Sequence, residues 1–135
     1  KDFAKDSKSS VTYTEDLESA IKGADIIYTD MWIALTEIDN VPLDRIYKLY
    51  PYRVDDKVME KTKDNSIFMH CLPAFHDKKS KLAKKVLDQL PDDMDFDGME
   101  VTDKVFRSAK SMVFDQTENR IPAVKAILYA TLRTD

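Results

Sequence analysis

The sequence predicts an α/β protein, with a doubly wound parallel sheet between two layers of helices. Short apolar runs typical of strands alternate along the chain with segments of helical periodicity, which is the pattern of consecutive βαβ units. The run Ile-Ile-Tyr at residues 26–28 is continuous rather than alternating, as expected for a parallel strand buried on both faces. Right-handed crossovers between such strands put helices on both sides of the sheet, giving three layers.

The first half of the chain begins with a short predicted strand at residues 11–13. Thr14 is expected to cap a helix that has acids in its first turn and ends at Gly23. Residues 24–30 form the next strand, which contains the continuous apolar run. The other elements of this half are two short helices, at residues 42–49 and 55–63.

The second half begins with a strand at residues 66–69, which leads into a polar loop. Residues 79–90 follow as an amphipathic helix, because Leu82, Val86 and Leu90 recur on one stripe. The remaining elements are strands at 99–102 and 111–115, a helical turn at 103–107 and a closing helix at 118–132.

Composition and charge restrict the class of protein. The 135 residues are enough for one domain, and a balance of 34% charged to 43% apolar residues is globular rather than disordered. A net charge of −4 and a pI near 5.2 argue against a nucleic-acid partner. No apolar run approaches the roughly 20 residues of a membrane span. A single cysteine predicts a reducing, cytoplasmic environment.

The low glycine count predicts that the chain is a piece of a longer protein. Only Gly23 and Gly98 occur, and the chain starts at Lys1 without a methionine. A complete α/β domain normally uses glycine in its first anion-binding turn. The same count disfavours a nicotinamide-binding domain, because Gly-x-Gly-x-x-Gly cannot be built from two distant glycines.

Residues 69–77, Met-His-Cys-Leu-Pro-Ala-Phe-His-Asp, are the expected location of a functional site. They hold the only cysteine and both histidines, directly after a predicted strand, where open α/β sheets bind ligands. A structural alternative stays open, in which Cys71 is a small buried apolar residue and the histidines are structural. No metal is expected, because His70 and Cys71 are adjacent and would point to opposite faces of a strand, and no second cysteine exists. No cofactor is expected.

Four segments together resemble the ornithine carbamoyltransferase family, in its second, amino-acid-binding domain. His-Cys-Leu-Pro at 70–73 is similar to the family's signature, and Phe-Asp-Gln-Thr-Glu-Asn-Arg at 114–120 resembles its acidic run ending in Glu-Asn-Arg. Residues 100–106 and 51–54 are similar to two further family segments. The order and spacing agree over roughly residues 11 to 133.

The resemblance implies a fold and an activity. Residues 1–135 would be part of the C-terminal ornithine-binding domain, an incomplete Rossmann-like domain. The N-terminal domain, with its Ser-Thr-Arg-Thr loop for carbamoyl phosphate, would be absent. The complete protein would transfer the carbamoyl group of carbamoyl phosphate to the side-chain amine of ornithine, giving citrulline and phosphate. Its expected assembly is a homotrimer or a higher multiple, with no nucleic acid and no membrane.

The resemblance also implies residue roles. Asp30 would bind the substrate amine and α-amino group, and Cys71 would contact the side-chain amine without forming a covalent intermediate. His70 and Leu72 would hold the carbamoyl group, Leu72 through its backbone carbonyl, next to a Pro73 whose peptide bond is expected to be cis. Arg120 would donate to the carbamoyl oxygen. The structural alternatives are a capping Asp30 and an Arg120 paired on its helix with Asp115 or Glu118.

One segment departs from the family pattern, Asp-x-Trp-x-Ser-Met-Gly. Asp30 and Trp32 match, but Ala34-Leu35-Thr36 stands where Ser-Met-Gly is usual. Ala34 lacks the hydroxyl of serine, and Thr36 has less conformational freedom than glycine. Ala34 and Leu35 remain candidate substrate-binding residues. The change leaves open a carbamoyltransferase for putrescine or another amine. Independently of it, a non-catalytic amino-acid-binding fragment or paralogue is a further alternative.

Overall fold

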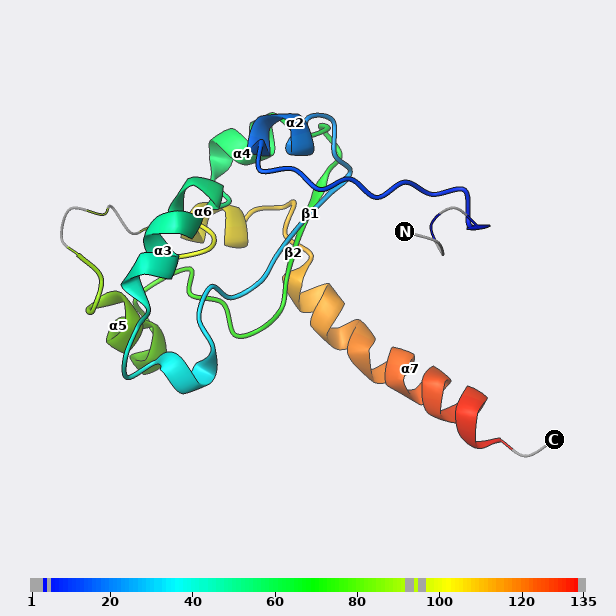
Figure 1. Cartoon of the computed structure of the whole chain (residues 1–135). Helices are drawn as coiled ribbons and strands as arrows, with labels where there is room; N and C mark the ends of the chain where they lie inside the picture. The colour runs from blue at the N-terminus through cyan, green and yellow to red at the C-terminus, as the bar shows by residue number, and fades with distance from the viewer. Residues whose placement is uncertain (1–3, 5, 92–93, 95–96, 134–135) are drawn as a thin grey trace.

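Two parallel strands form the centre of the protein, as the sequence predicts for an α/β fold (Figure 1). The computed structural model describes residues 4, 6–91, 94 and 97–133. Strand β1 (Ile26–Thr29) pairs with β2 (Ile67–His70) in a register that runs from Ile26 opposite Ile67 to Thr29 opposite His70. Both strands therefore end at the same edge of the sheet, and the residues that follow them are neighbours.

The helices match the predicted segments, with shorter bounds except for α7, which begins at Val113 rather than at residue 118. They are α2 (Leu17–Ile21), α3 (Leu43–Leu49), α4 (Asp56–Glu60), α5 (Lys81–Leu87), α6 (Asp103–Phe106) and α7 (Val113–Leu132), with 3-10 turns η1 (Leu35–Glu37) and η2 (Tyr50–Tyr52). Side chains cap four of them: Asp16 at α2, and Asp55, Ser80 and Thr102, which accept from Val58, Ala83 and Val105. Local sequence signals therefore set where these helices begin.

The predicted cap of α2 is wrong by two residues. Asp16, not Thr14, is the N-cap, and its Oδ1 accepts from the backbone amides of Glu18 and Ser19 at 3.1 and 3.3 Å. The Thr14 hydroxyl oxygen instead accepts from the amide of Asp16 at 3.0 Å. A carboxylate is the stronger acceptor for helix N-terminal amides, because it also opposes the helix dipole. Gly23 ends the helix with φ +68°, as predicted.

Three predicted strands are wrong in extent. Residues 11–13 have no regular structure, because no neighbouring strand pairs with them. The segment 99–102 is buried but makes only one parallel bridge, between Val101 and Val54. The segment 111–115 pairs only at Ser111, opposite Phe68, and α7 begins at Val113. Short apolar runs are ambiguous between strand and helix, and here tertiary contacts decide.

The prediction that β1 is buried on both faces is also wrong for this chain. Ile26 and Tyr28 are 53% and 55% exposed, on the face opposite Ile27. The continuous apolar run is present, but the described residues cover one of its faces only in part. An apolar strand face in this state is a surface suited to contact with another part of a larger protein.

Two apolar clusters stabilise the body of the molecule. The first packs the segment after β1 and helix α3 against α5, and its buried members are Trp32, Ile33, Val41, Ile46, Phe75, Ala83, Val86, Leu87, Leu90 and Met99. The second packs α2, α4 and α6 on β2, and its buried members are Ile21, Val54, Val58, Met59, Phe68, Val101, Val105, Phe106 and Val113. Phe68 on β2 and Phe75 after it belong to different clusters, so the intervening loop is anchored at both ends.

Helix α7 leaves the body beside β2 and extends away from it (Figure 1). Of its residues only Val113 is buried. Its exposed large apolar side chains are Phe114, Ile121, Val124, Ile127, Leu128, Tyr129 and Leu132. Neither α7 nor any other helix of the described chain combines the length and apolar character needed to span a bilayer.

Gly98 is the glycine that the fold requires most strictly. It has φ +90°, and a Cβ built there would lie 2.0 Å from the carbonyl oxygen of Val101 and 2.8 Å from that of His76. We expect Gly98→Ala to lower the free energy of unfolding by about 3 kcal/mol, measured by urea titration. Gly23→Ala is the matched control, with φ +68° and nothing within 4 Å, and should cost about 1 kcal/mol. Equal losses would show that the close approach at Gly98 is unimportant.

Candidate functional site

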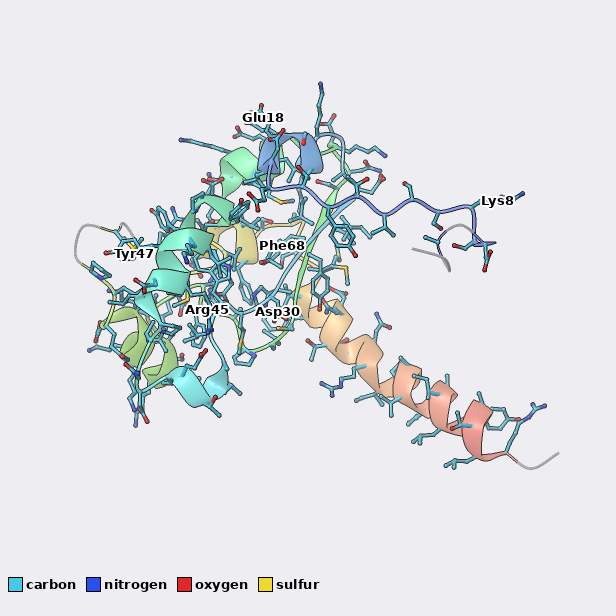
Figure 2. The ribbon with its side chains drawn as sticks, in the orientation of Figure 1. Lys8, Glu18, Asp30, Arg45, Tyr47 and Phe68 are labelled. Carbon is cyan, nitrogen blue, oxygen red and sulfur yellow. The ribbon has the colours of Figure 1, made fainter. Side chains whose placement is uncertain are left out.

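Asp30 and Cys71 meet at the carboxyl edge of the sheet. Each follows the last residue of its strand, Thr29 on β1 and His70 on β2, and these two are opposite in the register. Figure 2 labels Asp30 at this place. The Cys71 thiol donates to Asp30 Oδ1 at 2.7 Å, and the amide of Met31 donates to the same oxygen at 2.7 Å. The structure thus brings together two of the three candidate catalytic residues.

The protonation states of this pair follow from its geometry. Burial raises the pKa of the Cys71 thiol, and the hydrogen bond to Asp30 and its negative charge raise it further. Hydrogen bonds from the Cys71 thiol and the Met31 amide lower the pKa of Asp30. At neutral pH the pair is therefore a neutral thiol donating to an ionised carboxylate. This state agrees with the expectation that Cys71 is not a nucleophile, because the thiolate is the reactive form.

His70 lies beneath the loop rather than on its surface. It is 0% exposed, and its Nδ1 contacts the carbonyl oxygen of Cys71. Its Nε2 lies 3.3 Å from Oε1 of Glu100, which is also 0% exposed. Burial opposes the charge of His70, but Glu100 and the Cys71 carbonyl outweigh it and raise the pKa of the imidazole. Direct contact of His70 with a carbamoyl group remains a prediction, and its burial does not favour it.

Glu100 was not among the residues expected at the site. Besides facing His70, its Oε1 accepts from the amide of Phe75 at 2.6 Å. The available signal was an acid inside the apolar segment 99–102, since a charged residue in a buried segment needs a partner. The sequence could not identify that partner, which is 30 residues away.

Arg120 lies on α7 with its side chain exposed. It makes no ion pair or hydrogen bond with Asp115, Glu118 or any other residue that the structure describes. Gln116, one helical turn earlier on the same face, donates from Nε2 to the hydroxyl of Tyr28 at 3.0 Å. The guanidinium is therefore available to a ligand, but the structure does not bring it into contact with Asp30 or Cys71.

Leu72 and the segment after Trp32 complete the candidate set. Leu72 is 43% exposed, and its peptide bond to Pro73 is cis, as predicted. Ala34 and Leu35 are exposed at the start of η1. These surfaces are open to a ligand.

An ion pair that the sequence did not reveal anchors the segment around η1. The Ala34 amide donates to Glu37 Oε2 at 2.7 Å, and Arg45 from α3 donates to both oxygens of Glu37 at 2.8 and 2.9 Å. Arg45 also donates to the carbonyl of Trp32 at 3.2 Å. Hydrogen bonds from Arg45 and the Ala34 amide lower the pKa of Glu37. The carboxylate thus links both ends of the turn to a helix.

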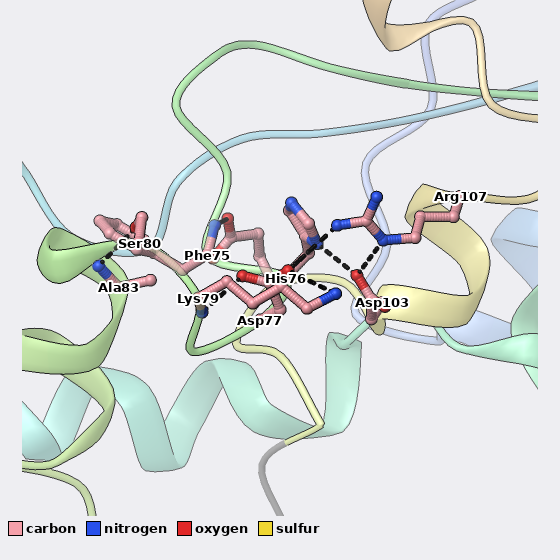
Figure 3. A network of polar contacts seen from close by, with 9 residues as sticks. Phe75, His76, Asp77, Lys79, Ser80, Ala83, Asp103 and Arg107 are labelled. Atoms are coloured by element: carbon pink, nitrogen blue, oxygen red, sulfur yellow. Dashed lines mark hydrogen bonds and ion pairs between the residues drawn. The ribbon is translucent and has the colours of Figure 1, made fainter.

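A polar network fastens the end of the 71–77 loop to α6 (Figure 3). His76 Nδ1 lies 2.7 Å from Asp103 Oδ1, and its ring stacks on Phe106 at 3.7 Å. Arg107 donates to Asp103 at 2.8 Å and to Asp77 at 3.1 Å. The imidazole and the two carboxylates are close enough to hold a metal ion, but the guanidinium already neutralises both acids. We therefore interpret the network as structural.

Comparisons with known proteins identify the family of this chain. The family described as "Aspartate/ornithine carbamoyltransferase, Asp/Orn binding domain" matches residues 1–131. The chain is 45% identical over 131 residues to a catabolic ornithine carbamoyltransferase of Bacillus licheniformis, covering 96% of this chain and 38% of that protein. It is 39% identical over 132 residues to a catabolic ornithine carbamoyltransferase of Clostridium perfringens, covering 97% of this chain and 39% of that protein.

A solved structure is similar over the same span. The ornithine carbamoyltransferase from Pyrococcus furiosus superposes with a TM-score of 0.74 at 32% identity, covering 96% of this chain and 34% of that one. The chain thus spans about 39% of the length of the curated relatives it matches. Because the family match extends over nearly all of the sequence, the chain belongs to the aspartate/ornithine carbamoyltransferase family and corresponds to its Asp/Orn binding domain.

Proposed function

We propose that the complete protein is an ornithine carbamoyltransferase and that this chain is part of its C-terminal ornithine-binding domain. The observation that carries the proposal is the pairing of the Asp30 carboxylate with the Cys71 thiol at 2.7 Å, on the His-Cys-Leu-Pro loop of a member of this family. An ionised carboxylate at the carboxyl edge of a parallel sheet is suited to binding the amino groups of ornithine.

The proposed reaction is the attack of the ornithine side-chain amine on the carbonyl carbon of carbamoyl phosphate. A C–N bond forms, the C–O bond to phosphate breaks, and the amine loses a proton, so that citrulline and phosphate are released. The amine must be neutral to attack, although its unperturbed pKa is about 10.4. Asp30 and Cys71 orient it, Arg120 donates to the developing oxyanion, and the Leu72 carbonyl holds the carbamoyl nitrogen.

A second domain that binds carbamoyl phosphate is part of the proposal. The exposed apolar side chains of α7 and the open face of β1 at Ile26 and Tyr28 support it, because apolar surfaces of this extent favour a protein partner. We assign that partner to the N-terminal domain of the same protein and propose a homotrimer, or a higher multiple, for the whole. We propose a cytoplasmic location, since the one cysteine carries a free thiol.

Two alternatives remain, and the first rests on the segment around η1. Ala34 presents a methyl group where the family pattern has a hydroxyl, so a substrate with fewer polar groups, such as putrescine or another amine, is the first alternative. The second is an amino-acid-binding fragment or paralogue without transfer. It would use Asp30 to bind the amino acid, but it would have no oxyanion for Arg120 to stabilise. Steady-state assays of the complete protein with carbamoyl phosphate and either ornithine or putrescine separate the three functions.

The double substitution Ala34→Ser with Thr36→Gly is expected to raise kcat/KM for ornithine in the complete protein. A restored hydroxyl can hydrogen-bond a charged group of the substrate, worth about 1–3 kcal/mol or roughly 5- to 150-fold. Ala20→Ser with Thr12→Gly, both at exposed positions, is the matched control and should change nothing. If ornithine is already strongly preferred and the double substitution has no effect, the turn binds through its backbone, and our inference from its side chains fails.

A further inference from the structure

His70 and Glu100 form a buried pair directly beneath the loop that carries Cys71 and Leu72. Both side chains are 0% exposed, and His70 Nε2 lies 3.3 Å from Glu100 Oε1. His70 ends β2, and Glu100 comes from the buried segment that bridges to Val54. Ionisable groups that are fully removed from water need a polar partner, and here each of the two side chains is the other's nearest one.

Both neighbours of the imidazole are hydrogen-bond acceptors. Nδ1 contacts the carbonyl oxygen of Cys71, and Nε2 faces the Glu100 carboxylate. A neutral imidazole has one donor, whereas an imidazolium has two, so only the charged ring suits both neighbours. Asp30, after β1, adds a second negative charge nearby, and the intervening Cys71 thiol is neutral.

Glu100 has a second contact at the far end of the loop. Its Oε1 accepts from the amide of Phe75 at 2.6 Å. Its Oε2 and the Nε2 of His70 are both buried with no hydrogen bond among the described residues, so the 3.3 Å approach of Nε2 to Oε1 is an ion-pair contact. The Phe75 amide and the His70 ring are the polar groups that lie against this carboxyl group.

We propose that Glu100 is a positioning residue that keeps His70 as an imidazolium, and that the two together hold the loop from Cys71 to Phe75 from below. His70 holds the carbonyl at the start of the loop, and Glu100 holds the amide at its end. Leu72 lies between these two anchors. The pair itself stands on geometry alone, and its catalytic consequence rests on the proposed carbamoyl transfer.

The first test is nitrogen NMR of this chain labelled with ¹⁵N-histidine. The chain has two histidines, and the variant His76→Gln assigns the signals. At pH about 7.5, one unit above the ordinary histidine pKa, both ring nitrogens of His70 should still be protonated. A bare ring nitrogen on His70 at this pH would overturn the proposal. No substitution of the pair is needed for this measurement.

Substitution of Glu100 then tests whether this residue determines the protonation of His70. Glu100→Gln should lower the pKa of His70, because the ring would stay buried without its counter-charge, whereas Glu100→Asp should keep it raised. Glu60→Gln, an exposed position on α4, is the matched control and should leave the titration unchanged. An unchanged His70 titration in Glu100→Gln would contradict the proposal. If Glu100→Gln does not fold, the nitrogen NMR of the unsubstituted pair decides.

The catalytic consequence is measured in the complete enzyme. Glu100→Gln should lower kcat by about 10- to 100-fold, as expected for small displacements of positioned groups, while KM for ornithine changes by less than about threefold. Glu100→Asp should recover part of the loss. If His70 is deprotonated in Glu100→Gln but kcat is unchanged, the positioning role of Glu100 is overturned. If the unsubstituted protein shows no transfer but His70 remains charged, the proposed function fails and the buried pair stands.

Discussion

The 135-residue chain on its own is expected to show no carbamoyl transfer to ornithine. It contains no Ser-Thr-Arg-Thr segment, and in the proposed enzyme the group that binds the departing phosphate lies in another domain. Holding two reactants in one geometry can supply about 7–11 kcal/mol of a reaction barrier. Without a site for carbamoyl phosphate, that contribution is lost even though Asp30 and Cys71 are in place.

The measurement is citrulline formation by the purified chain, expressed in a host that lacks its own ornithine carbamoyltransferase. The complete protein, prepared from the same host, is the positive control and should turn over. Turnover by the chain alone would refute the two-domain proposal, because this chain would then have to bind both substrates.

Asp30→Asn is expected to lower kcat/KM for ornithine by about 10- to 150-fold in the complete protein. A hydrogen bond to a charged group is worth about 1.5–3 kcal/mol, and the amide neither attracts an ammonium group nor accepts as strongly from the Cys71 thiol. Asp25→Asn is the matched control, because Asp25 is an exposed aspartate paired with Lys63 at 2.7 Å. A similar loss in both variants would show that the charge of Asp30 has no special role.

The same variant should make Cys71 more reactive. Burial and Asp30 together raise the pKa of the thiol above its ordinary value of 9.0, so removing the carboxylate should lower that pKa and speed alkylation by iodoacetamide at pH 8. Since the pKa of Asp30 is lowered and that of Cys71 is raised, the carboxylate–thiol pair persists between them, across neutral pH. The carboxylate–thiol pair should be lost in strong acid, where Asp30 is protonated, and in alkali, where Cys71 ionises. Equal alkylation rates in the two proteins would contradict this coupling.

Local sequence predicted the parallel α/β fold and most helices. Caps such as Asp55 and Ser80 act within three residues, and apolar periodicity is a property of one segment. The pairing of Asp30 with Cys71 was predictable for the same reason, because consecutive parallel strands end at one edge of the sheet. The failures at 11–13 and 111–115 occurred where a short apolar run needs a partner strand to become β structure.

Tertiary structure alone decided which side chains support that site. Two pairs join separate elements of the chain: Glu100 with His70, and Glu37 with Arg45. Neither pair has a sequence spacing that predicts it. The availability of Arg120 and the open face of β1 likewise depend on what packs against them. The charge and reach of each residue are properties of the sequence. The burial that gives His70 and Glu100 their role exists only once two distant segments exclude water together.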